Sequence, residues 1–305
     1  MKTLIAGLGG GLDIVNASAL YFLAKAAGED VYLGAIKSKC LDEIVGKTKI
    51  HPQAALIGPK TRFSRGGRYA EAHVADYLQR NVDERAQVFY FAQKDANGVN
   101  VAGLHDALMY TKQRYDFDQM IFVDCGGDSL TFVKEDAVAH AQTTDPFQGG
   151  DAVSLEALAA ITGTYLAVAA IGLDVDKQRA MDNLRLLDSK DSYVGALHLQ
   201  TADVCTKIPV KVDITGIRHY CRLVEEIAAL ATPATPNTDT TQKKFSSLTA
   251  PVLYHSICGN YGEQYTAANW AQARAGTVCV EPDYAIMQIV KADGIHKLKK
   301  QLNGV

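Results

Sequence analysis

The sequence lacks an excess of charge of either sign. Its 305 residues include 31 Lys and Arg against 34 Asp and Glu, which gives a formal net charge of −3, and the isoelectric point is near 6.2. Nucleic acids and anionic membrane surfaces attract basic proteins. This balance therefore favours neither partner, and we expect no nucleic acid and no membrane.

Long apolar runs are also absent. A run such as Leu155–Ile171 is broken by Glu156 and by Thr162-Gly163-Thr164, whereas a spanning helix needs about 20 apolar residues. The N-terminus enters a strand pattern directly, without a basic region followed by a cleavage site, so no signal peptide is predicted. We expect a cytoplasmic protein.

The sequence has no closely spaced cysteine pair of the CxxC type. Scattered cysteines favour reduced thiols over a disulfide framework or a zinc site. The P-loop pattern GxxxxGK[ST] and the hydrolase elbow GxSxG are missing too, which argues against those two enzyme classes. The six cysteines are Cys40, Cys125, Cys205, Cys221, Cys258 and Cys279.

Short apolar runs alternate with helical patterns along the chain. Such alternation predicts an α/β fold with a doubly wound, mostly parallel, Rossmann-like sheet of about seven strands. The predicted strands are Leu4–Leu8, Val31–Ile36, Val88–Ala92, Met120–Val123, Tyr165–Ile171, Pro251–Ile257 and Thr277–Val280. We expect one domain over residues 1–305.

The remaining segments are predicted to be helices and connections. We interpret Lys47–Gly67 as a polar loop, Lys177–Leu230 as a helix-rich connection and Ile289–Leu302 as a C-terminal helix. Residues 231–247 are rich in Thr, Pro, Asn and Ser, a composition typical of an exposed connection.

The first predicted strand leads into the turn GLGGGLD, from Gly7 to Asp13. A glycine turn between a strand and a helix opens backbone amides that attract anions, so we predict that Gly9, Gly10, Gly11 and the nearby Asn16 bind a ligand. Asp13 adds a carboxylate to this cradle. It holds a metal ion or an amine, or it caps the helix.

A dinucleotide site is not favoured by this turn. Dinucleotide-binding folds place an acidic residue at the end of the second strand, where it binds the ribose. Here Lys37 and Ser38 stand at that place, and the turn departs from GxGxxG. We therefore expect that NAD(P) is not the cofactor.

Further aspartates follow glycines at predicted strand ends or helix starts. Asp124 and Asp128 flank Gly126 and Gly127 in VDCGGDS. Strand ends of a parallel sheet meet at one edge, and clustered carboxylates need a counter-charge such as Mg²⁺. We predict Asp13 and Asp128 as metal ligands and Asp13, Asp124 and Asp128 as catalytic groups. The predicted ligand-binding residues of this kind are Gly126, Gly127, Asp151 and Asp174. Alternatively, each aspartate separately caps a helix or a turn.

An arginine-rich loop precedes the second predicted helix. In RFSRGGRY, Arg62, Arg65 and Arg68 recur at a spacing of three. Guanidinium groups pair with phosphate and carboxylate oxygens, so this loop is a predicted anion contact. The alternative is an ordinary solvated loop.

The order of these motifs resembles an uncharacterised prokaryotic family, common in archaea and classed as a domain of unknown function. Its members have a GGGGD-type first turn, a DxGGD strand end and a later glycine-aspartate strand end. Here GLGGGLD, VDCGGD and IGLD stand in that order, with Leu12 in place of a glycine and Val175 in place of Gly–Glu. The resemblance implies a Rossmann-like fold and no particular activity.

These patterns favour a cytosolic enzyme that acts on a small phosphorylated or nucleotide-like metabolite, with Mg²⁺ as the candidate cofactor. The expected partner is a small anionic ligand, and a homo-oligomer is compatible with the sequence. Two other classes stay open: a non-catalytic metabolite-binding protein on the same fold, and a structural subunit whose aspartates are only caps.

Overall fold

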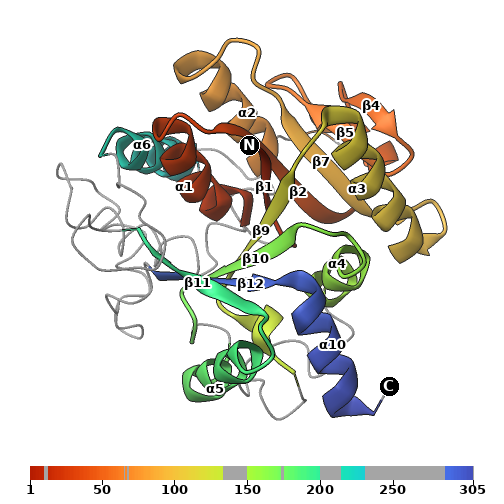
Figure 1. Ribbon diagram of the computed structural model, residues 1–305. Helices are drawn as coiled ribbons and strands as arrows, with labels where there is room; N and C mark the ends of the chain where they lie inside the picture. The colour runs from red at the N-terminus through yellow and green to blue at the C-terminus, as the bar shows by residue number, and fades with distance from the viewer. Residues whose placement is uncertain are drawn as a thin grey trace.

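The fold is known from a computed structural model, which describes residues 1–9, 13–64, 66, 69–132, 150–172, 175–199, 214–230 and 286–304. Within these residues the chain forms seven α-helices and a large, mostly parallel sheet (Figure 1). The chain is therefore a mixed α/β protein, as the alternating pattern predicts. The sheet is larger than predicted, with ten strands in place of about seven.

Five parallel strands form the centre of the sheet. Their order in space is β7-β2-β1-β9-β10, so β1 lies between β2 and β9. Each is an apolar run buried by helices on both sides, as is usual for parallel strands. Their bounds are Lys2–Gly7 for β1, Asp30–Cys40 for β2, Val88–Asp95 for β7, Gln119–Cys125 for β9 and Thr164–Ala169 for β10.

Antiparallel strands extend both sides of this centre. At one side β5 (Ala54–Ile57) pairs with β7 and with β4 (Thr48–His51), while β8 (Gly98–Val99) also pairs with β7. At the other side β12 (Ile286–Lys291) lies between β10 and β11 (Tyr193–His198). A separate small sheet pairs β3 (Ile44–Val45) with β6 (Arg62–Phe63).

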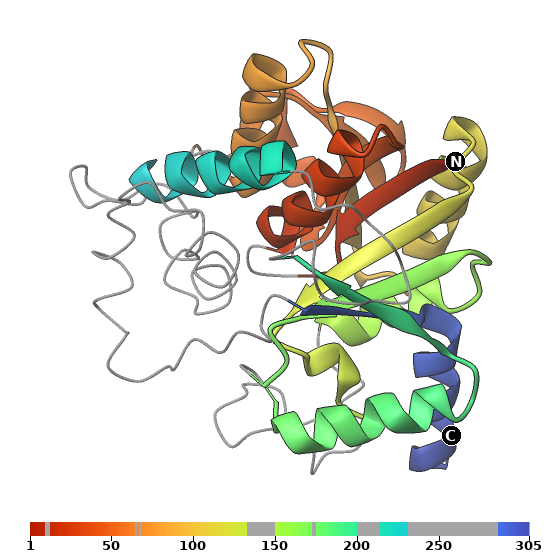
Figure 2. The same cartoon turned by 60° about the vertical axis from the view of Figure 1, so that its left-hand side comes forward.

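Helices cover both faces of the sheet, because alternate strand residues point to opposite sides. On one face Ile5 and Val123 pack with α1 (Asp13–Ala26), α2 (Ala70–Asn81) and α6 (Ile214–Leu230). Figure 2 shows α6 lying beside α1. On the other face Leu4 and Phe122 pack with the remaining helices. These are α3 (Val101–Tyr115), α4 (Gly150–Leu158), α5 (Lys177–Asp188) and α10 (Ala292–Asn303).

Several predicted segments differ from the structure. The polar loop Lys47–Gly67 contains strands β4 to β6, and the helix-rich connection contains the strand β11. The C-terminal helix begins at Ala292 and not at Ile289. The residues before it form β12, which pairs with β10 on one side and β11 on the other. The predicted strands Pro251–Ile257 and Thr277–Val280 and the connection 231–247 lie outside the described residues, and the single domain stays a prediction.

The cysteines correct one expectation. Cys40 and Cys125 form no disulfide, as expected, but Cys221 on α6 is disulfide-bonded. Spacing along the chain does not show which cysteines meet in space, so the wide spacing of the cysteines did not predict this disulfide.

None of the helices in the described residues is both long enough and apolar enough to cross a membrane.

Phe122 tests the packing of the central sheet, because it lies in β9 and is fully buried. Replacing Phe122 with Ala leaves a cavity under the helices, and we expect a loss of about 3–5 kcal/mol in the free energy of unfolding. Urea denaturation measures this change. Val99→Ala, at an exposed residue of β8, is the control and should change stability by less than about 0.5 kcal/mol. Equal effects of the two substitutions would contradict this packing.

Candidate functional site

Three aspartates meet at the carboxyl ends of the central strands. Asp124 comes from the end of β9, Asp128 from the short helical turn η2 (Asp128–Leu130), and Asp151 from the first turn of α4. One carboxylate oxygen of each lies within 4.8 Å of the others. We call these three residues the acid cluster. The sequence separates them by up to 27 positions, and the sheet brings them together.

Asp124 and Asp128 are held by the turn that follows β9. Ser129 donates two hydrogen bonds to Asp124 Oδ2, from its Oγ at 2.5 Å and from its backbone nitrogen at 3.3 Å. Gly127 has a φ of 99°, a left-handed conformation that suits glycine and starts η2 at Asp128. Asp124 is 2% exposed, while Asp128 is exposed to solvent.

Asp151 reaches the cluster because α4 starts against the end of β1. Ser154 Oγ donates a hydrogen bond of 2.7 Å to the backbone oxygen of Leu8, and Gln93 Nε2 donates one of 2.8 Å to Ser154 Oγ. The Asp151 carboxylate lies directly against Gly9, where any side-chain carbon would collide with it. Glycine at this position therefore leaves the space that the Asp151 carboxylate occupies.

The environment of the acid cluster disfavours the ionised form of its carboxyl groups. Burial raises the pKa of Asp124 well above its ordinary value of 3.8, and the nearby carboxylates of Asp128 and Asp13 raise it further. Burial likewise raises the pKa of Asp151, followed by the charges of Asp128, Asp124 and Asp13. Because carboxylates this close repel one another, the cluster favours either a bound proton or a cation.

Asp13 lies near the acid cluster but outside the set of three. It begins α1, and its Oδ2 accepts a hydrogen bond of 3.1 Å from the backbone nitrogen of Gly9. The backbone amide of Gly9 is thus used by the protein's own carboxylate. The sequence predicts that the backbone N–H of Gly9 binds an anion, but in the structure this N–H already donates to Asp13.

Asn16 lies one helical turn after Asp13, on the same side of α1. Its side chain is fully buried, and neither Oδ1 nor Nδ2 has a hydrogen-bond partner in the described structure. A buried amide without partners costs about 1–3 kcal/mol, so such a group calls for an explanation. A ligand or an ordered water beside α1 would supply one.

The two glycines of VDCGGDS shape the turn. The backbone nitrogen of Gly126 donates to Ala169 O at 3.0 Å, and Gly126 O accepts a hydrogen bond from the nitrogen of Gly172. A side-chain carbon at Gly127 would press on Val175 at 3.2 Å. The backbone N–H of Gly126 therefore links the turn to the end of β10. It donates to the protein's own backbone in place of a ligand.

Other predicted site residues are not brought to the acid cluster by the described structure. Arg62 is exposed on β6, in the small separate sheet. The others lie outside the described residues: Gly10, Gly11, Arg65, Arg68 and Asp174.

Two features of this edge were missed by sequence reasoning. Ser129 fixes Asp124, and its position directly after Asp128 was the available signal. Glu71 pairs with Lys37, with 2.8 Å between Oε1 and Nζ. No local pattern joins these two residues, because the contact depends on how α2 packs on β2.

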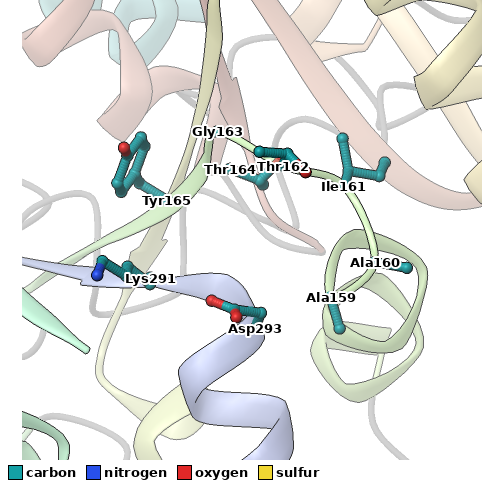
Figure 3. Close-up of a pocket in the computed structure, with 9 residues that line it drawn as sticks. All are labelled: Ala159, Ala160, Ile161, Thr162, Gly163, Thr164, Tyr165, Lys291 and Asp293. Atoms are coloured by element: carbon teal, nitrogen blue, oxygen red, sulfur yellow. The ribbon is translucent and has the colours of Figure 1, made fainter. Parts of the chain in front are cut away.

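A pocket lies away from the acid cluster, at the opposite end of β10. It has a volume of about 310 Å³ and is bordered by the end of α4, the start of β10 and the junction of β12 with α10. Figure 3 shows Asp293 at the start of α10, next to Lys291. None of the predicted site residues lines it.

Fold and site together define an α/β protein with a carboxylate cluster at the carboxyl edge of its sheet. A family model described as "Protein of unknown function (DUF1152)" matches residues 4–212, which is more than half of the chain. The chain belongs to this family, and the predicted resemblance to an uncharacterised family is confirmed. No curated protein and no solved structure matches the chain.

The raised pKa of Asp124 predicts how stability changes with pH in the absence of divalent cations. Above pH 3.8 the unfolded chain releases this proton first, whereas the folded protein keeps it up to the raised pKa. The folded state then binds more protons, so the free energy of unfolding falls as pH rises through this window. Asp124→Asn removes the titrating group and should flatten the fall.

Urea denaturation of both proteins between pH 4 and pH 8 measures this difference. All other titrating groups are shared, so the difference between the two curves isolates the cluster. A wild-type curve that rises relative to Asp124→Asn with increasing pH would contradict the assignment.

Proposed function

We propose that this protein is an enzyme that binds a divalent cation, with Mg²⁺ as the first candidate, at the acid cluster. The cation would hold the phosphoryl group of a small metabolite. The observation that carries the proposal is the approach of three carboxylate oxygens to within 4.8 Å of one another. Two oxygens on opposite sides of Ca²⁺ lie about 5 Å apart, which this spacing already allows, and on opposite sides of Mg²⁺ about 4.2 Å apart, so Mg²⁺ requires every pair of these oxygens to lie within that shorter distance.

The strand order supports this location. From β1 the chain proceeds outward through β2 to β7, then returns to β9 on the other side of β1 and continues to β10. We interpret this as the doubly wound, Rossmann-like arrangement, whose ligands bind at the carboxyl edge where the winding reverses. That point lies between β1 and β9, next to Gly9 and Asp124.

Charge supports a cation as the link to an anionic substrate. The amide of Gly9 already serves Asp13, and carboxylates surround the turn. A phosphate group alone would be repelled there, whereas a bound Mg²⁺ would offset the repulsion and draw charge from the phosphoryl oxygens. Asp124 and Asp151 must lose their protons when the cation binds, so the affinity should rise with pH.

Asp13 is our candidate for the general base. Its carboxylate is close enough to raise the pKa of Asp124 and Asp151, yet it is not one of the three clustered ligands. A base in this position could take a proton from a water or hydroxyl beside the cation. Transfer or hydrolysis at phosphorus is the reaction class that fits these groups.

One observation favours a second candidate, a non-catalytic metabolite-binding protein. The hydrogen bond from Gly9 occupies one oxygen of Asp13. A carboxylate that fastens a turn is a poorer base than one that faces only the substrate. Such a protein would bind the same ligands without converting them.

Stabilisation by Mg²⁺ tests the cation site. Binding to the folded state alone should raise the free energy of unfolding by about 2.7 kcal/mol when Mg²⁺ is at 100 times its dissociation constant. Asp124→Asn and Asp151→Asn should lose most of this gain. Asp30→Asn removes the same charge at the exposed amino end of β2 and serves as the matched control. Equal gains in all four proteins would contradict the site.

Release of phosphate from a panel of nucleotides and sugar phosphates separates the two candidate functions. Turnover that needs Mg²⁺ and is lost in Asp13→Asn would support the enzyme. Stabilisation by a panel member without any product would support the binding protein.

A further inference from the structure

A second group of buried polar side chains lies at the same edge of the sheet, on the other side of β1. Lys37 is near the end of β2, and Glu71 is in the first turn of α2. Lys37 Nζ lies 2.8 Å from Glu71 Oε1, and the two side chains are only 6% and 4% exposed. Figure 1 shows β2 beside β1, with α2 on the same side as α1.

The strand register places this pair next to the glycine turn. Gly7 is opposite Ala35 of β2 and opposite Val123 of β9. Lys37 lies in β2 two residues beyond Ala35, and Asp124 lies in β9 one residue beyond Val123, so both stand just beyond the level of Gly7. Two strand spacings separate them, which is about 10 Å. Because side chains alternate along a strand, Lys37 points to the face covered by α1 and α2, and Asp124 points to the face covered by α4. A ligand that contacts both the acid cluster and the Lys37–Glu71 pair would therefore cross the end of β1 from one face to the other.

The pair is a poor choice for stability alone. Buried ion pairs lose hydration and are often no better than apolar residues of the same size. Although Glu71 Oε1 is close to Lys37, it makes no well-directed hydrogen bond, and the buried hydroxyl of Tyr69 likewise has no hydrogen-bond partner in the described structure. The Tyr69 hydroxyl therefore keeps a capacity for hydrogen bonds that the described residues do not use, while Glu71 Oε1 is held by its ion pair with Lys37.

Tyr69 is fixed beside Glu71 by aromatic contacts. Its ring lies 4.6 Å from the ring of Phe63 and meets the ring of Tyr90 edge to face at 6.3 Å. Burial raises the pKa of the Tyr69 phenol, and the charge of Glu71, two residues further along the chain, raises it further. A neutral hydroxyl and a carboxylate thus stand together at the carboxyl edge.

The chemistry of these groups suits a sugar. In nucleotide-binding α/β folds, an acidic residue at the end of the second strand binds the ribose hydroxyls. This chain has Lys37 there, but Glu71 brings a carboxylate to the same place from α2. The carboxylate and the phenol can accept hydrogen bonds from neighbouring hydroxyls, and the ammonium group can donate one.

We infer that Glu71, positioned by Lys37 and aided by Tyr69, binds the adjacent hydroxyls of a ribose, so that the metabolite is a ribose phosphate or a ribonucleotide. The inference rests on the proposed function for its phosphate end, which would face the acid cluster. It deepens that proposal by naming the sugar.

Two pairs of probes that differ by one hydroxyl test the inference: AMP with 2′-deoxy-AMP, and ribose 5-phosphate with 2-deoxyribose 5-phosphate. Calorimetric titration with Mg²⁺ present measures each affinity. For wild type we expect the ribose member of at least one pair to bind about tenfold or more tightly, because a hydrogen bond to a charged group is lost with the hydroxyl.

The variants Glu71→Gln and K37M/E71M should reduce this ratio to about one. The double variant replaces both charges with apolar side chains of similar length, a change that buried pairs tolerate. The matched control is K39M/E43M, which removes an exposed pair of the same type near the end of β2, with 3.5 Å between its charged atoms. The control should keep the wild-type ratio.

Wild type that does not distinguish the members of either pair, or a ratio unchanged by both variants, would overturn the inference. The two proposals can also fail separately. A ratio that depends on Glu71 in a protein that shows no response to Mg²⁺ supports the ribose site and rejects the cation site. Stabilisation by Mg²⁺ through Asp124 without a preference for ribose rejects the ribose site and keeps the cation site.

Discussion

The mutual repulsion of three carboxylates is the constraint on which the site depends. Asp124 is almost fully buried, yet Asp128 and Asp151 lie within a few ångströms of it. Such a group needs protons or a cation to be tolerated, and the raised pKa values of Asp124 and Asp151 express this need. A protein with no use for the cluster would gain stability by replacing it with neutral residues. We therefore regard the cluster as the centre of the function.

The fold supplies what the cluster requires. Parallel strands end at one edge, so side chains from β9 and from the start of α4 converge beside the turn after β1. Gly9 leaves space for Asp151, and Gly127 lets the chain turn toward Asp128. On the other side of β1 the Lys37–Glu71 pair adds groups of a different kind. The end of β1 thus lies between two groups of polar residues. The acid cluster is the group that we propose binds a cation, and the Lys37–Glu71 pair is the group that we propose binds hydroxyls.

Local pattern predicts that Asp124 and Asp128 lie near a strand end, because an apolar run precedes them and glycines separate them. The structure places both in the acid cluster, and their role in function stays a prediction. The partnership of Asp151 with Gly9, the pairing of Lys37 with Glu71 and the strand β12 were not predicted. Each depends on contacts between distant segments, such as α4 against β1, α2 against β2 and β12 between β10 and β11. Periodicity along a chain carries no information on such contacts.

The most direct test of the central claim is a crystal structure of the protein with Mn²⁺, which replaces Mg²⁺ and is located by its anomalous scattering. The account predicts an anomalous peak coordinated by carboxylate oxygens of Asp124, Asp128 and Asp151. A peak elsewhere, or none at the cluster at a Mn²⁺ concentration that stabilises the protein, would contradict it.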